Sequence, residues 1–471
     1  MNRAMTGVVW AAGLAALTAC QHYTPAPLDP SRSAAALQSR SFHDAGLRAF
    51  MESVPGRRPA DWPPRDWALD DLTLVALYFN PTLELARAEW KASRAAMTTA
   101  GASPNPVLNV TPGLSANAPA GISPWFPMVT LDLPLETAGK RGHRIAVATH
   151  LADAARLATL NEAWHIRSEL RATLLEDDLL LRRMHELQRQ DSARERIQSM
   201  LDQRLEAGVV SRLEVGSARL ARSRSAADLA EAQRQWRSGR SRLARVLGLP
   251  LELVRSVTVA EGTLRPLDRL PGFNLGKARD AALTHRADVL AALSTYAASE
   301  SQLRLELAKQ YPDLHLAPGY QFDQGEHKWS LGLSVELPVL NRNQGPIAEA
   351  RARRDAEAVR FLALQAKILA DLERAGDACT AAEAQIEGLS KLRQAAEEQV
   401  ARLRAGVSAG GTDRMDLELA ILERGAAELS WIEADGRRNV ALGELEDALQ
   451  SDWKDLPVFE VRDKQNKEPQ P

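Results

Sequence analysis

The sequence predicts a mainly α-helical protein with a small β part, arranged as two similar halves. Three observations support this fold class. Ala, Leu, Arg and Glu abound while aromatic residues make up only 5% of the chain, long segments contain no proline, and short motifs recur at a constant spacing. With 471 residues the chain exceeds the ~250–300 at which a single core stops growing, so more than one structural unit is expected.

An internal repeat relates the two halves. Arg204–Val209 recurs as Arg402–Val407, 198 residues later, and Leu131–Pro134 recurs as Val335–Pro338, 204 residues later. Matches in the same order at nearly the same offset indicate a duplicated unit. We expect a first repeat at 69–248, a linker at 249–276, a second repeat at 277–450 and a polar tail at 451–471.

Each repeat is expected to contain three helical segments. They cover 69–101, 142–205 and 211–248 in the first repeat, and 278–310, 347–405 and 413–450 in the second. At 1.5 Å per residue, the segment 142–205 would be roughly 95 Å long. A helix of that length exceeds an ordinary domain, so it is expected to lie along neighbouring helices.

Two extended segments follow the first helix of each repeat and alternate apolar with polar residues. In the clearest one, Leu331 and Leu333 alternate with Ser330 and Ser334. Such alternation over ~10 residues is typical of outer-membrane barrel strands, although soluble hairpins on a core would show it too. Four strands are too few to close a barrel, so several chains in a symmetric ring would each have to donate four.

The amino terminus has the pattern of an export signal. Residues 1–19 combine Arg3 with an apolar stretch, and Leu17–Cys20 has the form of a bacterial lipobox. We expect Cys20 to be lipidated and residues 20–65, rich in Pro, Ser and Arg, to form an extended tether. The expected location is the outer membrane of a Gram-negative bacterium, lipid-anchored and extending into the periplasm.

Charge and reactive residues exclude several functions. The 59 basic and 61 acidic residues nearly balance, which argues against nucleic-acid binding. No spacing of His, Cys or carboxylates indicates a metal site, no motif indicates a cofactor, and no nucleophile–base pair indicates an enzyme. Cys379 is expected to be a helix-packing residue, and the acidic run Glu176–Asp178 a solvated helix face.

The order of elements resembles the TolC-like outer-membrane efflux proteins over nearly the whole mature chain. The resemblance implies that three protomers build a 12-stranded barrel, four strands from each, continued by a trimeric helical barrel. Residues 136–142 resemble the heavy-metal (CzcC-like) branch. The implied partners are outer-membrane lipid, a periplasmic adaptor and a resistance–nodulation–division pump of the inner membrane.

The resemblance also directs attention to the two turns between long and shorter helices. Acidic residues after such turns lie near the periplasmic tip in the family, which makes Glu214 and Asp416 candidates for a pore gate. The alternative for both is a structural role in the first helical turn, where the helix dipole favours a negative charge. Arg212 and Arg414 flank them and are candidates for a latch between helices.

The expected function is therefore a passive trimeric duct of a tripartite efflux system, exporting heavy-metal cations or drugs. Two alternatives stay open at this point. One is an exit duct for type I secretion, and the other is a lipid-tethered periplasmic coiled-coil scaffold with soluble hairpins.

Overall fold

The computed structural model describes residues 23–54, 61–118, 121–260, 262–264 and 275–450, which belong to two units, 1–41 and 42–471. In the first unit, helix α2 (Pro30–Gln38) is exposed along its whole length. The Asp29 side chain caps it by accepting a hydrogen bond from the backbone N–H of Ser31.

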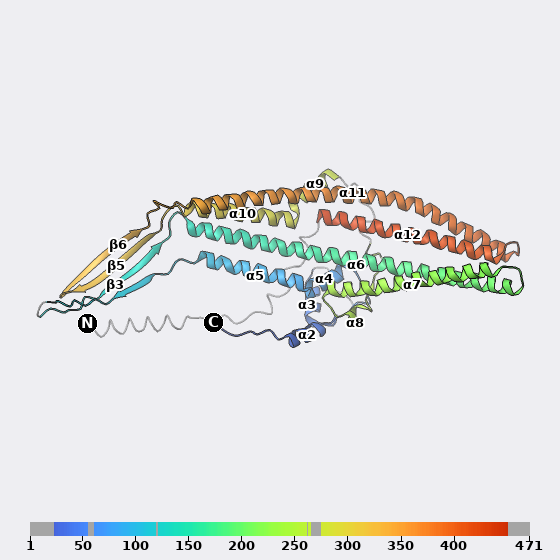
Figure 1. Ribbon diagram of the computed structural model, residues 1–471, viewed down its shortest axis with the longest axis horizontal. Helices are drawn as coiled ribbons and strands as arrows, with labels where there is room; N and C mark the ends of the chain where they lie inside the picture. The colour runs from blue at the N-terminus through green and yellow to red at the C-terminus, as the bar shows by residue number, and fades with distance from the viewer. Residues whose placement is uncertain (1–22, 55–60, 119–120, 261, 265–274, 451–471) are drawn as a thin grey trace. The chain divides into compact units, whose positions relative to one another are not determined.

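The second unit contains the same order of elements twice: a helix pair, two strands, a very long helix and a shorter helix (Figure 1). The first comprises α4 (Leu69–Phe79), α5 (Pro81–Gly101), β2 (Val107–Thr111), β3 (Met128–Leu135), α6 (Lys140–Glu206) and α7 (Arg212–Leu247). The second comprises α9 (Leu275–His285), α10 (Ala287–Ala308), β5 (Leu314–Asp323), β6 (Glu326–Val335), α11 (Gln344–Ser408) and α12 (Arg414–Leu449). The mainly helical fold class with a small sheet is confirmed.

The single helices expected at 69–101 and 278–310 are each broken, at Asn80 before Pro81 in the first repeat and at Arg286 in the second. Asn80 and Arg286 take extended backbone angles between two helices. Asn80 donates to the carbonyl of Val246 at 2.9 Å, and Arg286 donates to the carbonyl of Ala448 at 2.6 Å. Each break therefore holds the carboxyl end of the last helix of its own repeat, where unpaired carbonyls need donors.

Both very long helices start from a left-handed residue at the repeat offset. Gly139 has φ of 69° before α6, and Asn343 has φ of 62° before α11. Gly and Asn are the residues that tolerate this conformation best. The duplicated geometry turns each chain segment from a strand into a long helix.

The segment expected to be an extended tether contains helix α3 (Ala45–Ser53), which packs into the main core. That core joins α3 and α4 to the middle of α6 and the end of α7, with Leu47, Leu77, Trp164 and Leu247 almost fully buried. The linker supplies α8 (Leu251–Val254) and β4 (Thr258–Val259), and β4 pairs in parallel with β1 (Asp66–Trp67). None of the helices in the described ranges carries an apolar stretch of the length that a membrane crossing requires.

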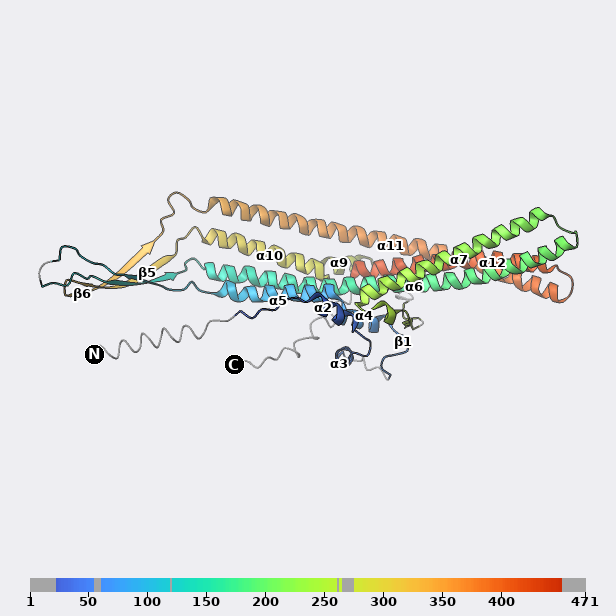
Figure 2. The same cartoon turned by 60° about the horizontal axis from the view of Figure 1, so that its bottom comes forward.

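The four other strands form one antiparallel sheet in the order β2-β3-β5-β6, so the two hairpins meet through β3 and β5. The sheet lies at one end of α6 and α11, and the turns α6–α7 and α11–α12 lie at the other (Figures 1 and 2). The two ends of the long helices thus have different roles: one meets the sheet and the other ends in bare helical hairpins.

Helix α12 packs closely on α6 because glycines on α12 leave room for α6 side chains. A Cβ at Gly443 would lie 2.9 Å from Nε of Arg171, and one at Gly436 would lie 2.9 Å from a methyl of Leu179. Arg171 is itself immobilised, since it donates to the carbonyl of Gly443 at 2.7 Å and pairs with Glu446 at 2.7 Å. The contact between α6 and α12, called here the α6–α12 seam, joins the two repeats.

We predict that Gly443→Ala lowers stability by roughly 1–3 kcal/mol, because the new methyl group displaces a buried guanidinium that has nowhere to move. The matched control is Gly388→Ala in α11, where an added Cβ meets nothing within 4 Å. That change removes a helix glycine and should raise stability by about 0.5–1 kcal/mol. Thermal unfolding of the two variants measures both effects, and an equal gain in both would contradict the close packing.

Candidate functional site

The four-stranded sheet has one apolar and one polar face. Directly paired residues share a face, and neighbours along a strand alternate between faces. Leu331 pairs with Pro318 and Leu333 with Leu316, while Ser330 pairs with Gly319 and Ser334 with His315. On the apolar face lie Leu108, Val110, Val129, Leu131, Leu133, Leu314, Leu316, Leu331, Leu333 and Val335. Leu331 and Leu333 are exposed, so this face has no cover within the described chain.

Aromatic side chains gather on the apolar face at the end of the sheet far from the helices. The rings of Tyr320 and Trp329 lie 4.9 Å apart, and those of Phe322 and His327 lie 5.4 Å apart. Tyr and Trp are enriched where an apolar surface meets water at a membrane boundary. The arrangement therefore has the form of one interfacial girdle.

At the other end of the sheet, polar contacts join strands to helices. Thr137 donates its backbone N–H to the carboxylate of Asp313 at 2.9 Å, and Lys140 donates to the same carboxylate at 2.8 Å. Arg144 forms a second link by pairing with Glu136 and donating to the carbonyl of Ala102 at 3.2 Å. The stretch 136–142 thus acts as the joint that fixes the first repeat's strand-to-helix turn against the second repeat.

Along its length, α6 carries arginines toward α12 and carboxylates toward α7. The pairs with the segment Asp413–Asp447 are Arg167–Glu446, Arg171–Glu446, Arg182–Asp435, Arg183–Glu433, Arg196–Glu418 and Arg204–Asp413. The pairs with α7 are Glu169–Arg245, Glu176–Arg242, Asp177–Arg240, Glu195–Arg222 and Asp202–Arg219. Complementary charge therefore sets which face of α6 meets which helix.

The seam is strongest near the sheet-proximal end of α12, at its carboxyl terminus. Arg171 is 3% exposed there and also pairs with Asp447 at 2.6 Å, while the indole of Trp164 donates to Asp447 at 3.1 Å. A buried, multiply bonded arginine of this kind typically costs 3–5 kcal/mol to leave unpaired. This end of the seam is the least able to open.

The seam is weakest at the helical tip. Arg196 pairs with Glu418 through two hydrogen bonds of 2.7 and 2.8 Å, with the arginine side chain 50% and the glutamate side chain 12% exposed. Arg204 pairs with Asp413 at 2.6 Å, where the two side chains are 37% and 44% exposed. Exposed pairs contribute only ~0.2–1 kcal/mol each. The buried arginine network thus lies at the core end of the seam, and the arginines of the pairs nearest the tip are exposed.

Asp413 has two roles at the tip. It caps α12 by accepting the backbone N–H of Met415 at 3.0 Å, and it binds Arg204 of the other hairpin. Hydrogen bonds from the Met415 backbone and then from Arg204 hold the pKa of Asp413 below its ordinary value. The link therefore stays charged to a lower pH than with an ordinary aspartate.

The residues singled out from the sequence lie at the tips but do not pair with one another. Glu214 closes a capping box at the start of α7, where its carboxylate accepts the backbone N–H of Ser211 at 2.7 Å. Asp416 lies in the first turn of α12, and like Arg212 and Arg414 its side chain is exposed with no ion pair among the described residues. Cys20 lies outside the described residues.

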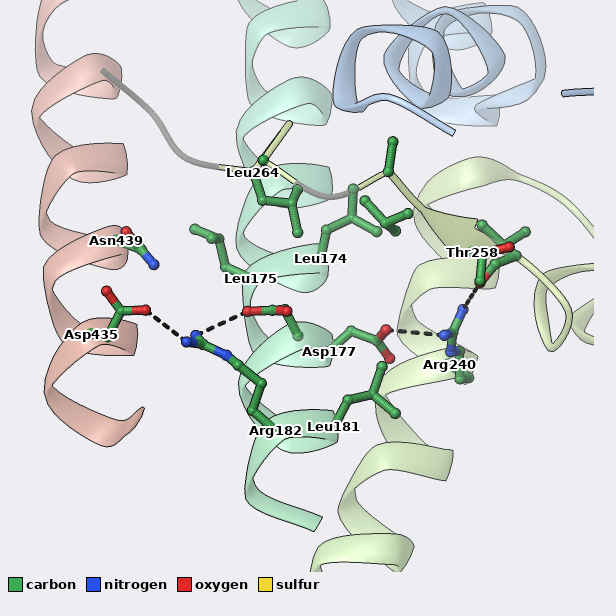
Figure 3. A pocket seen from close by; sticks show the side chains of 15 residues that line it. Leu174, Leu175, Asp177, Leu181, Arg182, Arg240, Thr258, Leu264, Asp435 and Asn439 are labelled. Carbon is green, nitrogen blue, oxygen red and sulfur yellow. Dashed lines mark hydrogen bonds and ion pairs between the residues drawn. The ribbon is translucent and has the colours of Figure 1, made fainter. Parts of the chain in front are cut away.

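A cavity of about 410 Å³ lies beside the seam, between α6, α7, α12 and the linker (Figure 3). Asp177 lines it and is buried, which corrects the expectation that the Glu176–Asp178 run is a solvated face. Burial raises the pKa of Asp177, and the Arg240 guanidinium at 3.0 Å opposes that shift. Arg240 also donates to the carbonyl of Val257 at 2.9 Å, so the pair ties the linker to α6 and α7.

The arginines of the seam were missed by sequence reasoning. Their regular placement on one face of α6 is visible in the sequence, but their partners lie more than 200 residues away. Cys379 is buried between α11 and α12, as expected for a packing residue. Across the described ranges, no group of three or more His, Cys, Asp or Glu is placed to hold a metal ion.

Comparisons with known proteins agree with this geometry. Residues 75–249 match the model of the outer membrane efflux protein family. The cobalt-zinc-cadmium resistance protein CzcC of Cupriavidus metallidurans is 24% identical over 294 residues, which cover 61% of this chain and 68% of the relative.

Two solved structures share the fold. A membrane protein from Pseudomonas aeruginosa has a TM-score of 0.68 at 20% identity, covering 83% of this chain and 98% of that one. The outer membrane protein VceC from Vibrio cholerae has a TM-score of 0.66 at 20% identity, covering 82% of this chain and 99% of that one. By its matching segment and its fold, the chain is similar to outer membrane efflux proteins: residues 75–249 match that family, and the fold is shared with the two solved structures.

Proposed function

We propose that three copies of the chain form the outer-membrane duct of a tripartite efflux system, passive in itself. The observation that carries this proposal is the two-faced sheet attached to the long helices. An exposed apolar face suits lipid, and a polar face suits a water-filled lumen.

Trimerisation follows from the edges of the sheet. In the described sheet, β2 and β6 each have a neighbour on one side only. Open edges do not persist in lipid, because each unpaired backbone group there costs several kcal/mol. A ring in which β6 of one copy pairs with β2 of the next satisfies them all, and three copies give the twelve strands of the family.

The proposed partners are a periplasmic adaptor and a resistance–nodulation–division pump of the inner membrane. The proposed cargo is heavy-metal cations, and the likeness to a cobalt-zinc-cadmium resistance protein supports it. The chain itself performs no chemistry in this proposal. It conducts what the pump delivers, and the lipid on Cys20 adds a second anchor to the barrel.

The proposed gate is the helical tip. A wide duct at rest would leak, so the tip has to be narrow until a partner widens it. The seam supports this position: its two pairs nearest the tip, Arg204–Asp413 and Arg196–Glu418, have exposed arginines, and the buried Arg171 network lies at the core end. In the trimer, we assign Asp416 and Glu214 to the acidic lining of this entrance and Arg212 and Arg414 to contacts between copies.

We predict that Leu333→Arg impairs membrane assembly, whereas Ser334→Arg leaves assembly intact and changes conductance. The first places a charge on the lipid face at a cost of roughly 2–4 kcal/mol near the bilayer midplane. The second places it on the polar face, where it meets water. The measurements are recovery of SDS-resistant trimers and single-channel conductance in planar bilayers. The periplasmic scaffold would be favoured instead by two results together. Both substitutions would be tolerated equally, and the unsubstituted protein would form no SDS-resistant trimers and show no conductance.

We predict that Arg204→Gln opens the tip more often, because it removes a link worth ~0.2–1 kcal/mol in each protomer. The open fraction should rise roughly 1.4-fold to fivefold per link lost. Single-channel recording gives the open fraction directly.

Asp416→Asn is the matched control at the same tip, because Asp416 forms no ion pair in the described protomer. It should leave the open fraction unchanged and weaken block by a trivalent cation added on the tip side, since fewer carboxylates line the entrance. If a trivalent cation blocks Asp416→Asn channels as strongly as native channels, Asp416 does not line the entrance. If Arg204→Gln leaves the open fraction unchanged, the Arg204–Asp413 pair does not hold the tip closed.

A further inference from the structure

One residue of the seam breaks its charge pattern. The α6 residues that form ion pairs with α12 in the described chain are arginines, but Glu186 places a carboxylate on that side. It is 3% exposed. The residue opposite is Gly425, where an added Cβ would lie 2.7 Å from Oε1 of Glu186 and 2.8 Å from Nε2 of Gln190. A glycine offers no side-chain donor, so α12 leaves this carboxylate without a direct partner from position 425.

The remaining contacts of Glu186 are weak. Arg189 of the same helix lies 3.5 Å away with a side chain 69% exposed. The buried amide nitrogen of Gln190 has no hydrogen-bond partner in the described chain. The charged groups that face Glu186 are Arg189 on its own helix and Arg424 and Glu428 on α12.

The two charges on α12 are shared with a third helix. Arg424 lies 3.6 Å from Glu397 of α11, and Glu428 lies 3.7 Å from Arg393 of α11. Each therefore interacts elsewhere as well, and neither neutralises Glu186 by a close contact. A buried carboxylate in this position costs more free energy when ionised than when protonated.

We propose that Glu186 makes the α6–α12 seam sensitive to pH, so that acid tightens the tip-side half of the seam and neutral or alkaline medium loosens it. The proposal rests on the proposed duct function for its biological meaning, because the seam is where the two hairpins would separate during opening.

The direction follows from linkage. Burial raises the pKa of Glu186 above its ordinary value, and Arg424 and Arg189 only partly oppose this. In an opened seam the carboxylate meets water and its pKa returns toward that ordinary value. The closed seam therefore binds the proton more tightly, so closure gains stability as pH falls through the raised pKa and loses it as pH rises.

The test measures the seam itself rather than conductance. Spin labels on cysteines introduced at the exposed positions Ser192 of α6 and Glu423 of α12, in the full-length Cys379→Ala chain, report the distance between the two helices. Labelled chains are diluted with unlabelled ones so that only distances within a chain are seen. The distance distribution is recorded from about pH 5 to about pH 9, a range that spans the pKa values of buried carboxyls.

In the chain with native Glu186, we expect a longer-distance population that grows with pH. Glu186→Gln should hold the short distance at every pH, because the amide mimics the protonated acid. Glu195→Gln, an exposed acid of the same helix that faces α7, should keep the pH dependence of the native residue. Arg424→Gln removes an opposing cation and should move the transition to higher pH.

Two results would overturn the proposal. One is the same pH profile in Glu186→Gln as with the native residue, and the other is a longer distance in Glu186→Gln at all pH values, which would make Glu186 an attractive tie. Either would leave the duct function standing, because that function is judged by trimers and conductance. Conversely, a pH-dependent distance between α6 and α12 in a protein that shows no conductance would support the pH sensitivity of the seam and refute the duct function.

Discussion

The ion pairs between α6 and α12 are the interaction on which the rest of the structure depends. The two repeats are separate in sequence, and α6 of the first meets α12 of the second along most of both helices. Arginines on α6 and carboxylates on α12 fix which faces meet, and glycines on α12 let the helices approach. The two β-hairpins lie side by side because β3 pairs with β5, and α6 also contacts α10 of the second repeat.

The two ends of the seam differ in how much free energy their separation costs, and this difference determines where the two hairpins can part. Near the core a buried arginine, an indole and several carbonyls form one network, which is expensive to break. Near the tip, single exposed pairs join two helical hairpins with little apolar burial around them. A force or a partner that acts on the tip therefore separates the hairpins there, while the core and the sheet keep their geometry.

Much of this fold was predictable, because its elements depend on patterns of residues that are close in the sequence. The repeat offset, the proline-free helices and the alternation of Leu331 and Leu333 with serines predict the elements and the two-faced sheet. The break at Asn80 was missed although Pro81 signals it, whereas the break at Arg286 holds the end of a helix more than 160 residues away. Helix α3 was missed because its apolar residues are few and their core is made by α4 and α6.

The candidate site was less predictable, for a physical reason. The sequence indicates that Glu214 and Asp416 follow turns, but the capping role of Glu214 depends on Ser211 and on the backbone geometry of the helix start. The burial of Asp177 depends on Arg240 and the linker, and that of Glu186 depends on a glycine in the other repeat. A charged residue on a solvated helix face and one on a buried face look the same in the sequence. Which of them is buried depends on the helix that packs against that face.

Amide hydrogen exchange along α12 in the assembled protein tests the graded seam most directly, because exchange measures the free energy of local opening residue by residue. The account predicts that protection is highest near Gly443 and falls steadily toward Arg414, with the residues around Glu418 opening independently of the core. Uniform protection along α12, or the strongest protection at the Arg414 end, would contradict it.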